Sequence, residues 1–280
     1  MTRATGRFGS RVRAVAALGF GFISVASAAT WEETVTASSP PRFPPPRPVH
    51  ATYRFGWSGF TAATAEARLS QPSPNRFQLD GAGHTVGLVR ALWKFDANHT
   101  SIADATTLHP LEVTQIEKAR SKKIVTNLSF DSTGVTSRRL ETPSKNPAPK
   151  IRRFDFPHLF DLQSALLYLR SQPMPDRGVQ RIVVYPATSA YLATVTVLGR
   201  EHFSGAAGAY NAIKLDLQLS KIGKNRELEP HRKFRRGTIW ISDDSDRLLL
   251  RIEAQVFVGT VFAELQSVQF DDVKPPRPPE

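Results

Sequence analysis

The densest group of polar side chains is the run Trp-Ile-Ser-Asp-Asp-Ser-Asp-Arg at residues 240–247. Asp243, Asp244 and Asp246 could offer carboxylate oxygens to Ca²⁺, which takes roughly 6–8 oxygen ligands. The run lacks the glycine and the closing glutamate of an EF-hand loop. Aspartate and serine also bond their own backbone in hairpin turns, and we favour a turn here. The sequence therefore predicts no metal site and no cofactor.

Catalytic patterns are weak elsewhere. None of the seven histidines forms a helix-borne zinc pair, and no Gly-x-Ser-x-Gly occurs. His202 follows Glu201 in the sequence, so an acid and a base are neighbours, but no third residue of known geometry joins them. We predict no catalytic residue. The alternative is a hydrolase or other enzyme acting on envelope polysaccharide or lipid, with Asp243, Asp244 and His202 as its candidate residues.

Basic side chains gather at a predicted turn and before the Trp240 strand. If they share one rim of the fold, each contributes about 1 kcal/mol to contact with an anionic membrane. The alternative is an ordinary solvated strand face. The basic residues are Lys118, Arg120, Lys122 and Lys123, then Arg232, Lys233, Arg235 and Arg236. Four aromatic residues are expected to line an apolar interior or to fill it, and filling is the commoner case in small barrels: Trp57, Phe60, Trp93 and Phe95.

The first 28 residues have the pattern of a secretory signal peptide. Four arginines precede an apolar run at residues 14–25, and Ala26-Ser27-Ala28 offers a small-residue cleavage site. The run is too short to span a bilayer comfortably. We therefore expect a periplasmic protein that is not transmembrane after cleavage.

The net charge and the absence of cysteine limit the kinds of partner that we expect. Cleavage leaves 280 − 28 = 252 residues with a net charge of 12 − 4 = +8, because the leader holds four arginines and no acids. Anionic lipid, polysaccharide or an envelope protein are the expected partners, and nucleic acid is not. The chain has no cysteine, which excludes disulfides and a lipid-carrying cysteine.

Proline-rich segments mark the limits of one domain. They lie at residues 40–48 and 274–280 and favour polyproline II or disordered ends. We predict a linker over 29–48, a single β-rich domain over 49–273 and a tail over 274–280.

Period-two alternation dominates the predicted domain and indicates half-buried strands. More than ten short strands with few helices predict a mainly β fold, in which a curled antiparallel sheet forms a barrel or half-barrel. The predicted strands are residues 52–57, 76–80, 93–102, 111–118, 124–130, 134–141, 179–184, 191–197, 213–219, 237–241, 248–257 and 260–270.

One amphipathic helix interrupts this pattern at residues 161–170. Its apolar face comprises Leu162, Ala165, Leu166 and Leu169, Asp161 can cap its first turn, and a proline at 173 stops it. We expect this helix to cover one end of the curled sheet. A shorter helix is possible over 86–92.

The order of several short motifs resembles an exported bacterial family, domain of unknown function 3108. The motifs are Tyr53-x-x-x-Trp57, Leu108-x-Pro110, the helix pattern with Asp161, Ser164, Ala165, Tyr168 and Arg170, and the run from Trp240 to Arg247. The resemblance covers roughly residues 49–270. It implies a periplasmic, mostly antiparallel barrel or half-barrel and no established activity.

These observations favour a non-enzymatic periplasmic binding or envelope-assembly module. Its ligand is expected to be apolar or anionic, such as lipid or polysaccharide, or a protein partner. The candidate binding residues are Trp57, Trp93, Tyr168, Arg170, Trp240, Asp243, Asp244 and Arg247.

Overall fold

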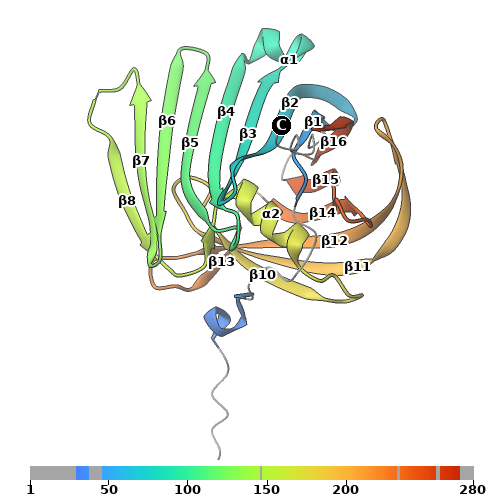
Figure 1. Ribbon diagram of the computed structural model, residues 1–280. Helices are drawn as coiled ribbons and strands as arrows, with labels where there is room; N and C mark the ends of the chain where they lie inside the picture. The colour runs from blue at the N-terminus through green and yellow to red at the C-terminus, as the bar shows by residue number, and fades with distance from the viewer. Residues whose placement is uncertain (1–29, 38–45, 146, 232–233, 257–258, 272–280) are drawn as a thin grey trace, which may run out of the picture.

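The computed structural model describes residues 30–37, 46–145, 147–231, 234–256 and 259–271 (Figure 1). Sixteen strands form one sheet in these residues, and every pairing is antiparallel except that of β9 with β10. The predicted mainly β, curled antiparallel sheet is therefore confirmed. The expected closure into a barrel is not found, because β8 and β9 end the sheet without pairing to each other.

The first half of the chain is a simple meander with one short helix, α1, between β3 and β4. Consecutive strands are joined by tight connections, which makes each strand the neighbour of the next. The elements are β1 (Val49–Trp57), β2 (Phe60–Ser73), β3 (Arg76–Thr85), α1 (Gly87–Leu92), β4 (Phe95–Asp104), β5 (Pro110–Ala119), β6 (Lys122–Asp131), β7 (Gly134–Thr142) and β8 (Lys150–Asp155).

The second half begins at the opposite edge of the sheet and returns to β1. Its elements are β9 (Leu159–Phe160), α2 (Leu162–Ser171), β10 (Val179–Val184), β11 (Tyr191–Gly205), β12 (Gly208–Ile222), β13 (Leu228–Pro230), β14 (Phe234–Ser242), β15 (Leu249–Val256) and β16 (Gly259–Phe270). β16 pairs with β1, so the first and last long strands are neighbours inside the sheet.

The curl of the sheet follows from this order. β8 and β9 are opposite edges, yet only residues 156–158 separate them in sequence. Three intervening residues allow the two strand ends to lie at most about 14 Å apart. The sheet must therefore wrap around until its edges lie close together, and α2 lies in the space that it surrounds (Figure 1).

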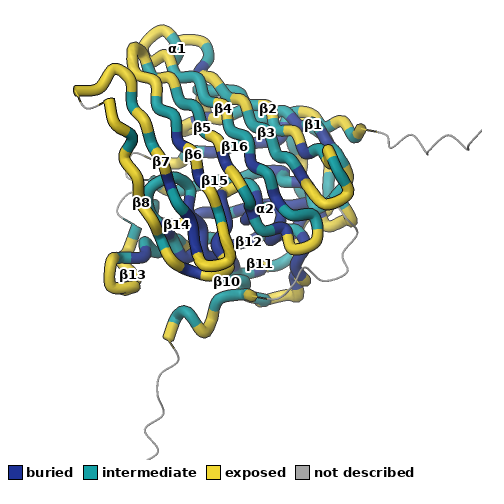
Figure 2. Tube along the Cα trace, turned by 60° about the vertical axis from the view of Figure 1, so that its left-hand side comes forward, coloured by how far each residue is buried: buried dark blue, intermediate teal, exposed yellow. Residues whose placement is uncertain are grey.

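Buried residues of the described chain form two hydrophobic clusters. Figure 2 shows how buried and exposed residues are distributed along the strands. The larger cluster joins α2 to β1–β3, β10–β12 and β14–β16, with Phe77, Phe160, Tyr168 and Ile213 almost fully buried. The smaller cluster lies by the sheet edges and includes Leu128 and Tyr185. At the start of β1, Val49 and Ala51 face inward and their neighbours face outward, as strand geometry requires. A register shift between Phe55 and Gly56 reverses this order, so Gly56 is buried and Phe55 and Trp57 are exposed.

The segment before β1 also packs on the sheet. A single turn of 3-10 helix (Trp31–Thr34) stacks Trp31 on Phe156, with ring centroids 5.5 Å apart. The Thr36 backbone N–H donates to the Arg181 carbonyl at 2.8 Å. Part of the expected linker over 29–48 is therefore packed against the domain. The predicted leader over 1–28 and the tail over 274–280 lie outside the described residues. No helix in the described part is long and apolar enough to cross a membrane.

Candidate functional site

The polar run after β14 forms a turn, as its composition predicts. Asp244 Oδ1 accepts hydrogen bonds from Ser242 Oγ at 2.8 Å and from the backbone N–H groups of Asp246 and Arg247 at 2.9 and 3.0 Å. This carboxylate therefore holds the β14–β15 hairpin together. No group of three His, Cys, Asp or Glu side chains suited to a metal ion occurs among the described residues.

The other polar candidates of this region form an outer network. Asp243 pairs with Arg200 at 2.9 Å. Trp240 Nε1 donates to Glu201 Oε1 at 2.6 Å, and this bond lowers the pKa of Glu201. His202 lies on β11 opposite Asn211, and no contact among the described residues joins it to Asp243 or Asp244. The residues of the enzymatic alternative are thus not brought together as a catalytic group.

The start of α2 is fixed by a buried carboxylate. Asp161 is fully buried and forms a capping box with Ser164, accepting from the Gln163 N–H at 2.9 Å. Its Oδ2 also accepts from Ser164 Oγ at 2.5 Å and from Ser101 Oγ of β4 at 2.9 Å. The sequence predicts the cap but not the contact with Ser101, which lies 60 residues away.

The end of α2 is tied to the β14–β15 turn. Arg170 donates to the backbone carbonyl of Asp246, and Arg247 donates to the Gln172 carbonyl at 3.5 Å. Tyr168 is almost fully buried, with its ring 4.6 Å from that of Phe160. Of the predicted binding residues, Arg170 and Arg247 thus join the end of α2 to this turn, Tyr168 packs on Phe160, and Asp244 holds the hairpin. Their role in binding a ligand stays a prediction.

Burial also perturbs a tyrosine beside Arg170. Burial raises the pKa of Tyr53 to about 12 from an ordinary 10.0, while the positive charge of Arg170 opposes the rise. The Tyr53 hydroxyl donates to the Leu249 carbonyl at 3.0 Å, which requires the protonated form. Both groups line a small cavity of about 110 Å³ on one side of α2.

We expect the stability of the fold to fall between pH 10 and pH 12 because of Tyr53. In this range the unfolded chain loses the phenol proton and the folded chain retains it, so the free energy of unfolding declines, by about 2 kcal/mol. Urea unfolding across this pH range should show a steeper decline for the natural protein than for Tyr53→Phe. Identical slopes would show that Tyr53 titrates normally.

A larger cavity of about 490 Å³ lies on the other side of α2. The helix contributes Leu162, Ala165, Leu166 and Leu169, which are the four residues of the predicted apolar face. Five strands complete the wall with Ile182, Val184, Ala193, Val195, Leu217, Leu219, Ile239 and Ile252. The apolar face of the helix thus borders a space that protein atoms leave unfilled.

Among the described residues that line this cavity, two are polar, Tyr191 and His231, and they lie beside Pro186. Their rings lie 5.4 Å apart, and His231 Nδ1 accepts from the Phe234 N–H at 2.8 Å. Leu162 is 59% exposed, so the helix side of the lining reaches solvent. The sequence could not predict this cavity, although alternation in β10 to β12 places its wall residues on one face.

Another hollow, of about 570 Å³, includes outward-facing residues of β1 to β4 and of β16. Its charges are largely satisfied within the protein, because Arg68 pairs with Asp271 at 3.2 Å and His50 approaches Glu66 at 3.6 Å. Thr100 also donates to Asp80 at 2.7 Å. This groove therefore offers few unpaired groups to a ligand.

Three of the four aromatic residues expected in the interior lie at the surface, and the fourth, Phe95, is half-buried. Phe60, Trp93 and Trp57 are 77%, 50% and 49% exposed. They lie at the β1–β2 turn and directly after α1, and neither tryptophan lines the apolar cavity. The prediction that they fill or line the interior is wrong, because both short connections carry these side chains outward.

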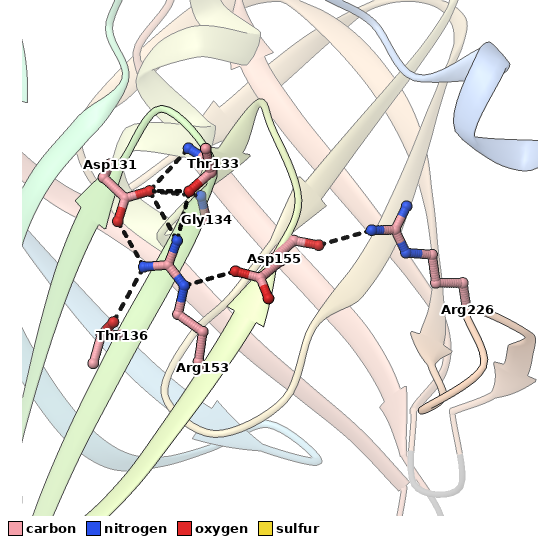
Figure 3. A network of polar contacts seen from close by, with 7 residues as sticks. All are labelled: Asp131, Thr133, Gly134, Thr136, Arg153, Asp155 and Arg226. Carbon is pink, nitrogen blue, oxygen red and sulfur yellow. Dashed lines mark hydrogen bonds and ion pairs between the residues drawn. The ribbon is translucent and has the colours of Figure 1, made fainter.

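A network of charged side chains joins the edge strand β8 to the β6–β7 turn (Figure 3). Arg153 pairs with Asp131 at 2.6 Å and with Asp155 at 2.7 Å, and the bond from Arg153 lowers the pKa of Asp131. Arg226 donates to the Asp155 carbonyl at 3.0 Å. Arg153 is therefore part of the scaffold and is not an unpaired cation for a ligand.

Comparisons with known proteins agree with the fold. The family model DUF3108, described as a protein of unknown function, matches residues 52–266. A beta-barrel-like protein of domain of unknown function DUF1849 from Brucella abortus aligns with a TM-score of 0.55 at 10% identity, over 81% of this chain and 99% of that one. At this identity the likeness shows the fold alone.

Two further solved structures are more distant. A protein with a YmcC-like fold from Bacteroides fragilis, described as exported, has a TM-score of 0.31 over 81% of this chain and 98% of that one. A protein from Parabacteroides distasonis, described as a lipoprotein, has a TM-score of 0.32 over 81% and 97%. Both are 10% identical, and these scores are too low to indicate a shared fold. No curated protein matches the chain significantly.

Proposed function

The chain belongs to the DUF3108 family, whose description assigns no activity, and we propose that it is a non-catalytic binding module that holds one aliphatic chain of a lipid. The observation that carries this proposal is the cavity of about 490 Å³ between α2 and the strands β10–β12, β14 and β15. Ligand cavities range from about 300 to 1,000 Å³ and are mostly apolar with a few polar groups.

The chemistry of the wall favours an aliphatic ligand. Leucine, isoleucine, valine and alanine provide nearly all of it. An apolar wall offers water no hydrogen-bond partners, so such a cavity binds apolar molecules in preference to water. Each methylene group of a bound chain contributes roughly 0.8 kcal/mol. Tyr191 and His231 offer polar groups to the end of the chain that carries oxygen.

The predicted leader suggests where such a lipid is found. Export would place the domain in the cell envelope, which is rich in acylated molecules. A predicted mature charge of 12 − 4 = +8 would favour anionic lipids over neutral ones. We therefore include in the proposal that the protein works in the cell envelope and that its cavity prefers anionic lipids.

Filling the cavity tests the proposal. Ala193 of β11 lines the cavity between its strand partners, Ile182 of β10 and Leu219 of β12. Ala193→Phe should therefore occupy the space that the ligand needs. We expect the affinity for a dansyl-labelled fatty acid to fall about tenfold or more, measured by fluorescence titration.

Thr194→Phe is the matched control, because residue 194 is on the opposite face of the same strand. It should retain probe binding. The melting temperature of Ala193→Phe should not fall far, since the new ring enters unfilled space. Equal probe affinity in the natural protein and in Ala193→Phe, or no probe binding at all, would overturn the assignment of this cavity to a lipid chain.

A further inference from the structure

Five large apolar side chains are exposed where β1, β2 and the β3–β4 connection meet at one end of the strands. We call this set the apolar rim. Phe60 and Leu88 are each 77% exposed, Leu92 is 70% exposed, and Trp93 and Trp57 are about half exposed at 50% and 49%. Isolated apolar side chains at a surface are normal, but a contiguous group marks an interaction site.

Backbone hydrogen bonds hold the rim segments side by side. The Val86 N–H, just before α1, donates to the Ala62 carbonyl of β2 at 3.0 Å. At the next turn at this end of the strands, the Arg120 N–H donates to the Lys94 carbonyl at 3.0 Å. Figure 1 shows α1 and the neighbouring hairpins at the same end of the strands, and Figure 2 shows that much of this end is exposed.

The charges beside the rim are mainly positive. Two of the three nearby carboxylates are already paired, Asp96 with Arg90 at 2.8 Å and Glu141 with Lys122 at 2.9 Å. The third is Glu117. Three lysines and one arginine add four positive charges, and all of them are exposed: Lys94, Lys118, Arg120 and Lys123.

We propose that the apolar rim docks on the surface of an anionic lipid bilayer. The exposed rings and leucines would enter the interfacial region, and the lysines beside them would lie at the level of the phosphates. Tryptophan beside leucine, phenylalanine and lysine is the composition of membrane-interface segments. Protein–protein interfaces, in contrast, are depleted in lysine.

This surface is separate from the apolar cavity, because no rim residue lines that cavity. The two functions are nevertheless compatible, since a module that carries an acyl chain must meet a membrane to collect or deliver it. The docking inference does not depend on the cavity, and it fails or succeeds on a different measurement.

Flotation with lipid vesicles tests the inference. The purified protein should bind vesicles of equal parts phosphatidylcholine and phosphatidylglycerol and should bind pure phosphatidylcholine much more weakly. The double variant Leu88→Ser with Leu92→Ser should lower the affinity for anionic vesicles about tenfold or more, because it removes the side chains that enter the interface. Lys118→Glu with Lys123→Glu should do the same by reversing the attraction.

The control carries the same kinds of change on β13 and in the turn before it. Leu228 is 39% exposed and Lys224 is also exposed, and β13 lies far from α1 in both views (Figures 1 and 2). Leu228→Ser with Lys224→Glu should leave vesicle binding unchanged. All variants should keep the melting temperature and the fatty-acid affinity of the natural protein, which separates this test from that of the cavity.

Two results would overturn the inference. One is equal binding of the natural protein to neutral and anionic vesicles, or to neither. The other is retention of anionic vesicle binding in both rim variants. A rim that binds no vesicle but captures a purified envelope protein would assign the surface to a protein partner instead.

Discussion

Tyr168→Ala should lower the free energy of unfolding by about 4 kcal/mol, the typical cost of deleting a large buried ring. Tyr168 is 2% exposed, and its ring contacts Phe160, which in turn lies 4.6 Å from His109. Removing it leaves a cavity between α2 and the β9–β10 edge of the sheet. Urea unfolding followed by circular dichroism measures the change.

Tyr168→Phe is the matched control. It retains the ring and removes a hydroxyl whose contact with the Thr36 carbonyl is long, at 3.4 Å. We expect Tyr168→Phe to lower the free energy of unfolding by about 1 kcal/mol or less. If Tyr168→Ala were as stable as the natural protein and lost ligand binding alone, Tyr168 would be a binding residue, as the sequence first suggested.

Asp161→Ala should lower the free energy of unfolding by about 3 kcal/mol, because two losses add. The helix loses its N-cap, which is worth about 1 kcal/mol. The hydroxyls of Ser101 and Ser164 also lose their acceptor, and a buried hydroxyl without a partner costs roughly 1–3 kcal/mol. Ser164 and Ser101 are both fully buried, so bulk solvent does not reach their hydroxyls.

Asp161→Asn separates the two contributions. The amide oxygen can still accept from the Gln163 N–H, so the cap survives in part. We therefore expect a smaller loss than with alanine, measured by the same unfolding experiment. Equal stability of Asp161→Ala and the natural protein would contradict the view that this carboxylate fixes α2 inside the sheet.

The strands were predictable where large apolar residues alternate with polar ones. Residues 191–197 and 213–219 lie within β11 and β12, and the short helix suggested over 86–92 corresponds to α1. β2 was missed because its inward positions are mostly alanine, as in Ala63, Ala65 and Ala67, which give little contrast with their polar neighbours. β8 was missed because its residues are mainly charged and exposed.

The candidate site was predictable only in parts. The apolar face of α2 is evident from a spacing of three and four residues, but the sequence does not reveal how far that face lies from β10–β12. The cavity depends on this distance. The composition of the run after Trp240 predicts the turn that the structure contains. Its link to Arg170 joins residues 76 positions apart, so it depends on the fold.

The exposed aromatic residues show a limit of composition arguments. Tryptophan is a residue type that is common in protein cores, yet Trp57 and Trp93 are exposed. Their exposure follows from their positions in the β1–β2 turn and in the connection between β3 and β4. The pattern Gly-Leu-Val-Arg-Ala-Leu-Trp-Lys, with leucines and a tryptophan in a segment too short to bury them all, is the feature that could have indicated a surface role.

The most direct test of the account is to locate a bound fatty acid by methyl NMR of the natural protein. Titration with palmitate should shift the methyl signals of Leu217, Leu219 and Ile239 around the cavity and produce intermolecular contacts to them. Val113 and Leu128 in the second hydrophobic cluster should stay unchanged. Contacts confined to Leu88 and Leu92 of the apolar rim, or no shifts at the cavity under saturating palmitate, would contradict the proposal that the space beside α2 holds a lipid chain.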